Sequence, residues 1–95
     1  VYIIGTESDN ITPVDSYARK YHKLIVHSEY YEFKGKVGHY IMLAEANDKL
    51  KKEDPVLFTD HPSVNRKKVH LKVSELSVSF FNQKLHLNQE ITFSK

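Results

Sequence analysis

The stretch VYIIGTESDNITP, residues 1–13, opens the chain with the pattern that decides the fold. Its first four residues are apolar and end at Gly5, which is typical of a strand covered on both faces, as in a parallel sheet. A polar loop follows. We expect Thr12 to cap a helix that begins at Pro13, because threonine favours the N-cap and proline the first helical turn. The stretch therefore predicts a strand, a loop and a helix in succession.

The pattern continues into a second strand. One apolar helix face is predicted by the i, i+3, i+4, i+7 spacing of Val14, Tyr17, Ala18 and Tyr21. The aromatic segment SEYYEFKG, residues 28–35, then alternates as an edge strand does. A strand, a helix and a strand in this order favour a parallel pair joined by a right-handed crossover. The predicted fold class is α/β.

The second half of the chain predicts a long loop and a final helix. Residues 45–65 are polar and contain a charge run and two proline dipeptides, so we expect an irregular excursion. A helix over about residues 64–85, capped by Ser63, is predicted by the apolar spacing of Val69, Val73, Leu76 and Phe80, joined by Phe81 and Leu85. We interpret the aromatic helix residues as core-facing: Tyr17, Tyr21, Phe80 and Phe81.

Composition limits the chain to a small globular domain. It has 95 residues and a net charge of +2 with interspersed signs, which gives no reason to expect nucleic acid as a partner. No apolar run is long enough to span a membrane. Cysteine is absent, and the spacing of the histidines predicts neither a metal site nor a cofactor.

Two residues are placed where this fold puts its chemistry. Asp9 follows the first strand and His39 follows the second, within GKVGHYIML, residues 35–43. If the two strands are parallel neighbours, about 4.8 Å apart, the loops that follow them leave the same edge of the sheet. Open α/β sheets place their ligand-binding and catalytic sites at that edge. A carboxylate there accepts the Nδ1 proton of the histidine and leaves Nε2 to act as a base. Gly35 and Gly38 are expected to let the chain turn tightly.

Structural alternatives stay open for these side chains. Asp9 could be a turn aspartate and His39 a hydrogen-bonded structural histidine, and Glu7 is a rival for the acid role. His70 is interpreted as structural, bonded to Asp60 or the loop. No serine lies in a G-x-S-x-G elbow, so a complete serine hydrolase is not encoded in this chain.

The residues then resemble a known family. Residues 1–13, with an aspartate followed by x-I-x-P, resemble the acid-bearing loop of α/β-hydrolases, and residues 35–43 resemble their histidine loop. Residues 38–85 are similar to the C-terminal end of bacterial predicted dienelactone hydrolases, themselves similar to platelet-activating-factor acetylhydrolases. The matching positions are Gly38, His39, Tyr40, Leu43, Asp60, Pro62, Val64, Arg66, His70, Phe80 and Phe81. Many relatives carry cysteines where this chain has Ala46 and Phe58.

The resemblance implies a C-terminal fragment of an α/β-hydrolase, spanning residues 1–95. Asp9 and His39 would be its catalytic acid and histidine, acting on an ester or lactone with a serine from a missing N-terminal segment and no cofactor. Arg66 and Asp60 are expected to form an ion pair that holds the loop. An alternative hypothesis is a non-catalytic α/β domain that binds a partner or a second copy through an open sheet edge.

Overall fold

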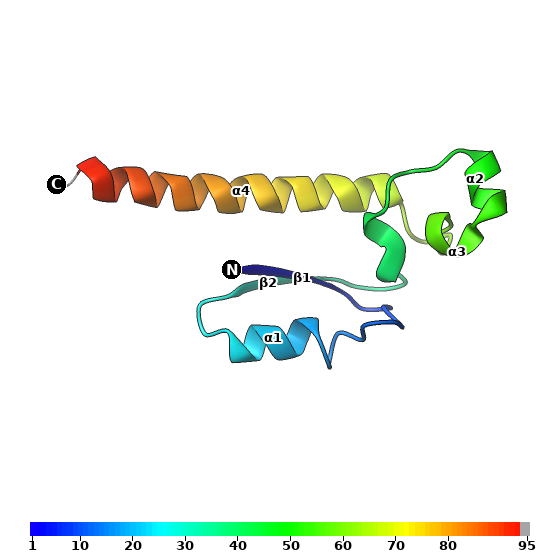
Figure 1. Ribbon diagram of the computed structural model, residues 1–95, viewed down its shortest axis with the longest axis horizontal. Helices are drawn as coiled ribbons and strands as arrows, with labels where there is room; N and C mark the ends of the chain where they lie inside the picture. The colour runs from blue at the N-terminus through cyan, green and yellow to red at the C-terminus, as the bar shows by residue number, and fades with distance from the viewer. Residues whose placement is uncertain (94–95) are drawn as a thin grey trace.

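The computed structural model describes the backbone of residues 1–93 and the side chains of residues 1–85 (Figure 1). Within residues 1–93, two strands, one 3₁₀ helix and four α-helices follow one another. Their order is β1 (Tyr2–Thr6), α1 (Ala18–Leu24), β2 (Glu29–Phe33), η1 (His39–Met42), α2 (Asp48–Glu53), α3 (Pro55–Phe58) and α4 (Arg66–Phe93).

The two strands form a parallel sheet, as the strand–helix–strand order predicts. Tyr2 pairs with Glu29 and Thr6 with Phe33, so both strands end level with each other. The loops that follow β1 and β2 therefore leave the same edge of the sheet. The α/β fold class is confirmed at this level: a two-stranded parallel sheet with packed helices.

Helices cover the sheet on its two faces, with α1 on one side and α4 on the other (Figure 1). Because strand side chains alternate, Ile4 and Tyr31 face α4 and pack against its core residues. The core itself consists of Phe33, Val37, Ile41 and Val69. Ile41 is the most enclosed of these, with 2% of its surface exposed, and it belongs to the short helix η1.

Gly5 lets α1 approach the sheet closely. A Cβ atom at this position would lie 2.6 Å from the Tyr30 hydroxyl oxygen and 2.9 Å from the Ala18 Cβ. Both distances are shorter than van der Waals contact allows, so a side chain here would force the helix away from the strand. The glycine that ends the apolar run of the sequence thus sets the spacing between sheet and helix.

The first helix begins later than its sequence predicts. Residues 14–17 form turns, and α1 starts only at Ala18. Thr12 does not cap the helix, since Tyr17 is the residue that precedes it, and the Thr12 hydroxyl donates a hydrogen bond to Asp9. The predicted apolar face is correspondingly reduced: Val14 is buried, whereas Tyr17 and Tyr21 are 42% and 48% exposed, and their interpretation as core residues was wrong.

The second half of the chain also differs from prediction. The segment expected to be irregular, residues 45–65, contains α2 and α3, with the Asn47 side chain capping α2. The final helix starts at Arg66, where Asn65 rather than Ser63 accepts a hydrogen bond from an amide of the first turn, that of Lys68. Its backbone continues beyond the expected end, to Phe93.

The aromatic residues of α4 divide between the sheet and solvent. The ring of Phe80 packs edge-on against Tyr2, with 5.6 Å between the ring centroids. Phe81 and Leu85 are 61% and 58% exposed, so their expected place in the core is wrong. No helix within residues 1–93 has both the length and the apolar character needed to cross a membrane.

Candidate active site

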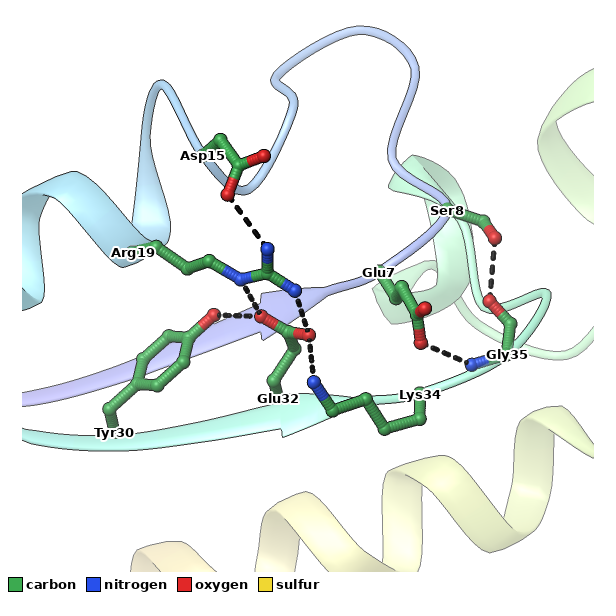
Figure 2. Close-up of polar contacts among 8 residues, drawn as sticks. All are labelled: Glu7, Ser8, Asp15, Arg19, Tyr30, Glu32, Lys34 and Gly35. Atoms are coloured by element: carbon green, nitrogen blue, oxygen red, sulfur yellow. Dashed lines mark hydrogen bonds and ion pairs between the residues drawn. The ribbon is translucent and has the colours of Figure 1, made fainter.

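The loops that follow β1 and β2 are joined by hydrogen bonds at the end of the sheet. The backbone amide of Glu7 donates to the carbonyl of Phe33 at 2.9 Å, and that of Ser8 donates to the carbonyl of Val37 at 3.0 Å. Side chains add to this connection. The Glu7 carboxylate accepts a hydrogen bond from the backbone amide of Gly35, and the Ser8 hydroxyl donates one to the Gly35 carbonyl (Figure 2). Backbone and side-chain hydrogen bonds thus join the two loops.

Only one of the two glycines in the second loop is required by backbone geometry. Gly35 has a φ of 83°, in the region that favours glycine, so the tight turn expected there is present. Gly38 has an extended backbone, and a Cβ atom there would lie 3.8 Å from the Ser8 carbonyl oxygen, an ordinary contact. The expectation that Gly38 is needed for a tight turn was wrong.

Asp9 and His39 meet at the top of the two strands. The Nδ1 atom of His39 lies 2.9 Å from Oδ2 and 3.1 Å from Oδ1 of Asp9. The side chains are 11% exposed for Asp9 and 32% exposed for His39. The juxtaposition that the sequence predicts is therefore present, in a setting where the carboxylate is buried and the imidazole reaches solvent.

Hydrogen bonds from its own loop hold the Asp9 carboxylate in place. The backbone amides of Ile11 and Thr12 donate to Oδ1 at 2.9 and 2.7 Å, and the Thr12 hydroxyl donates to Oδ2 at 2.9 Å. These hydrogen bonds are those of a turn aspartate, which was the structural alternative for Asp9. They occur together with the contact to His39. Asp9 thus both shapes its loop and orients the histidine.

These contacts also keep Asp9 ionised. Burial raises the pKa of this carboxyl group, but the donors from Thr12, His39 and Ile11 outweigh that effect and leave the pKa below its ordinary value. An ionised carboxylate only accepts hydrogen bonds, so the facing Nδ1 atom of His39 carries a proton. In the neutral ring Nε2 is then the unprotonated nitrogen, and it makes no hydrogen bond to any of the described side chains.

The local geometry separates Asp9 from its rival. The Glu7 carboxylate accepts a hydrogen bond from the amide of Gly35, so Glu7 stabilises the loop that follows β2. Asp9, in contrast, contacts the histidine. Ser8 is likewise engaged with the Gly35 carbonyl. Among residues 1–85, whose side chains are described, no serine hydrogen bonds to His39. The site holds an acid and a base without a nucleophile among those residues.

A second carboxylate cluster was missed by the sequence reasoning. Glu32 lies on β2 with its side chain 4% exposed, and Arg19 of α1 binds it through two hydrogen bonds of 2.7 and 2.6 Å (Figure 2). Lys34 and the Tyr30 hydroxyl each donate to the same carboxylate at 2.6 Å. No local motif joins residues 13 positions apart in a strand and a helix, so the sequence carried no signal for this cluster.

The ionisation of the Glu32 cluster is fixed by its donors. The hydrogen bond from Arg19, which outweighs the opposing effect of burial, and those from Lys34 and Tyr30 hold the pKa of Glu32 well below its usual range. Burial and the bond to Glu32 raise the pKa of Tyr30 to about 12. Glu32 is therefore ionised and the Tyr30 hydroxyl keeps its proton near neutral pH, so the cluster is a fixed contact that joins α1 to β2.

The predicted contacts of the last helix are present in part. Arg66 forms the expected pair with Asp60, through Nε and Nη2 at 2.9 Å each. The arginine is buried, with 7% of its surface exposed, so solvent screens the pair less than it screens an exposed ion pair. His70 bonds neither to Asp60 nor to its loop: its Nε2 lies 2.6 Å from the carbonyl oxygen of Ile41 in η1.

Within residues 1–85, no group of three or more histidine, cysteine, aspartate or glutamate side chains is arranged to hold a metal ion. Comparisons of the chain with protein-family models, with curated proteins and with solved structures found no match. The geometry of the Asp9–His39 pair is therefore the observation that bears on function.

Proposed function

We propose that this chain carries the acid and the histidine of a serine hydrolase that cleaves esters or lactones on an α/β-hydrolase fold. The observation that carries the proposal is the 2.9 Å contact between Asp9 Oδ2 and His39 Nδ1, at the shared end of two parallel strands. A buried acid against Nδ1, with Nε2 left without a partner, is the arrangement that activates a hydroxyl nucleophile.

The chemistry assigned to the pair follows from its protonation. A serine from a segment outside this chain attacks the ester carbonyl while Nε2 of His39 accepts its proton. Asp9 stabilises the imidazolium that forms, and the imidazolium then protonates the departing alcohol. In the second half of the reaction His39 accepts a proton from water, which attacks the acyl-enzyme and releases the acid product.

The surroundings of the pair support this role over a purely structural one. Nδ1 of His39 is bound to Asp9, whereas its Nε2 has no partner among the described residues and the ring is 32% exposed, so Nε2 is free to receive a proton from a hydroxyl group. The loops that carry the two residues are bonded to each other at several points, which fixes the pair before any substrate arrives.

Labelling with a fluorophosphonate probe tests the hydrolase proposal. The probe reacts with an activated serine, so it should label the protein encoded by the natural gene, including the region upstream of Val1, and should not label this chain alone. His39→Ala and Asp9→Asn in that longer protein should abolish labelling, and Glu32→Gln is the matched control that should keep it. An upstream sequence without a nucleophile serine, or an unlabelled full-length protein, would contradict the proposal.

A second candidate function is association through the sheet edge. Within the described residues β1 pairs only with β2, so its outer edge is unpaired. An apolar groove of about 600 Å³ lies beside that edge, lined among others by Ile3, Val14, Tyr21, Ile41 and Val73. Unpaired edges with apolar flanks are sites where a further strand adds.

Light scattering after gel filtration tests this second candidate. Self-association predicts a dimer whose fraction rises with concentration and falls with Ile3→Lys, because a charge in the groove opposes pairing. Val26→Lys is the control, since Val26 is 85% exposed and lies outside the groove. A monomer at every concentration would exclude self-association as the function of the edge.

A further inference from the structure

The segment that bears His39 is too short to hold its own shape. Helix η1 has four residues, His39–Met42, and backbone bonds at its two ends run from Ile41 to Gly38 at 3.4 Å and from Leu43 to Tyr40 at 3.1 Å. A 3₁₀ helix of this length is not stable alone, since nucleation costs more than one or two hydrogen bonds return. The direction of the His39 ring therefore depends on contacts from elsewhere in the fold.

Helix η1 lies against both α3 and α4, and one face of α4 supplies the side-chain hydrogen bonds to it. Arg66, Val69 and His70 are spaced i, i+3 and i+4, so they point the same way from the helix. Val69 is 7% exposed and packs in the core with Ile41. His70 Nε2 lies 2.6 Å from the carbonyl oxygen of Ile41, two residues beyond His39.

Arg66 holds the exit of the same segment. Its Nη1 donates to the carbonyls of Leu43 and Ala44, at 3.3 and 3.4 Å, directly after η1 ends. Its other nitrogens bind the Asp60 carboxylate, so the buried charge is neutralised and the guanidinium is fixed in orientation. The core packs Ile41 from one side while His70 and Arg66 hold the carbonyls that follow His39.

We propose that His70 is a positioning residue for His39. It donates its Nε2 proton to the Ile41 carbonyl and so fixes the turn that aims the His39 ring at Asp9, with Arg66 securing the end of that turn. The bond keeps its donor in both the neutral Nε2–H form and the doubly protonated form of the ring. The inference rests on the proposed function, since it assigns His70 a role in orienting the proposed base.

Replacements of His70 that differ in reach test the proposal in this chain. The amide nitrogen of His70→Gln can replace Nε2, whereas that of His70→Asn is one methylene too short, and His70→Leu has no donor. The readout is the tautomer of His39, observed by long-range ¹H–¹⁵N correlation spectra of histidine-labelled protein. Glu75→Gln is the control, because it removes a surface charge of the same helix away from η1.

Wild type, His70→Gln and Glu75→Gln should show His39 with its proton on Nδ1. In His70→Asn and His70→Leu the His39 ring should lose the signal of its Nδ1 proton. Its spectrum should then resemble that of His27, which is exposed. An unchanged His39 tautomer in His70→Asn, even with lowered stability, would overturn the proposal; this comparison decides the matter if His70→Leu fails to fold. The spectra need no nucleophile, so they can succeed or fail independently of the probe labelling that tests hydrolysis.

Discussion

Asp9 and Glu32 both have largely enclosed side chains and lowered pKa values, and the difference between their partners separates a candidate site from a structural contact. Glu32 is neutralised by the cations of Arg19 and Lys34. Asp9 faces an imidazole, a side chain that serves as acid or base in catalysis, and two neutral donors from Thr12. A perturbed carboxylate thus indicates function only when its partner can exchange a proton.

The largest difference is expected in hydrolysis by the longer protein that we propose. His39→Ala and Asp9→Asn should each lower kcat/KM by about 10⁴-fold, because the base is lost or held in the wrong tautomer. Glu32→Gln should change kcat/KM by less than about tenfold, since Glu32 contacts neither residue. Rates with a nitrophenyl ester measure this, and equal losses from the Asp9 and Glu32 variants would remove the distinction between them.

The segment that carries His39 is stabilised by the core residue Ile41 of the same short helix. Ile41→Ala should lower the free energy of unfolding by about 3 kcal/mol, because the side chain is 2% exposed and its removal leaves a cavity. Chemical denaturation measures the change. Met42→Ala is the neighbouring control, and it should cost less since Met42 is 46% exposed; a similar cost for both would contradict the packing described for η1.

The face of the sheet that carries Glu32 is stabilised by the close packing of α1 against it. Gly5→Ala should lower the free energy of unfolding by about 2 kcal/mol, because its Cβ would collide with the Tyr30 hydroxyl that binds Glu32. Gly38→Ala should be close to neutral, since its Cβ meets only an ordinary contact. Thermal unfolding of the two variants compares them directly, and a neutral Gly5→Ala would show that α1 can retreat without cost.

Acid sensitivity is expected to show the smallest difference. A carboxyl group with a lowered folded pKa adds stability above its unfolded value of about 4, and that stability is lost as the pH falls toward the folded pKa. The pKa of Glu32 is lowered far more than that of Asp9. Glu32→Gln should therefore flatten the loss of stability below about pH 4 more than Asp9→Asn does. Denaturant midpoints across pH 2–6 measure this, and the reverse order would contradict the assigned charge states.

The sequence predicted the features that follow from local pattern and topology. Apolar and aromatic runs around a helix gave the parallel strands, and the rule that parallel loops share an edge brought Asp9 and His39 together. The sequence did not predict polar contacts that depend on tertiary packing. No local pattern pairs Arg19 with Glu32 or His70 with the Ile41 carbonyl, and none indicates that α1 begins at Ala18 rather than after Thr12.

The bond between the carboxylate of residue 9 and the ring of residue 39 is tested most directly by the imidazole NMR signals of the chain itself. Spectra of wild type and Asp9→Asn near neutral pH would locate the His39 proton, with exposed His27 as the internal reference. We predict a persistent Nδ1 proton in wild type that is lost in Asp9→Asn. A His39 that behaves like His27 in wild type, or that is unaffected by the substitution, would contradict the pairing.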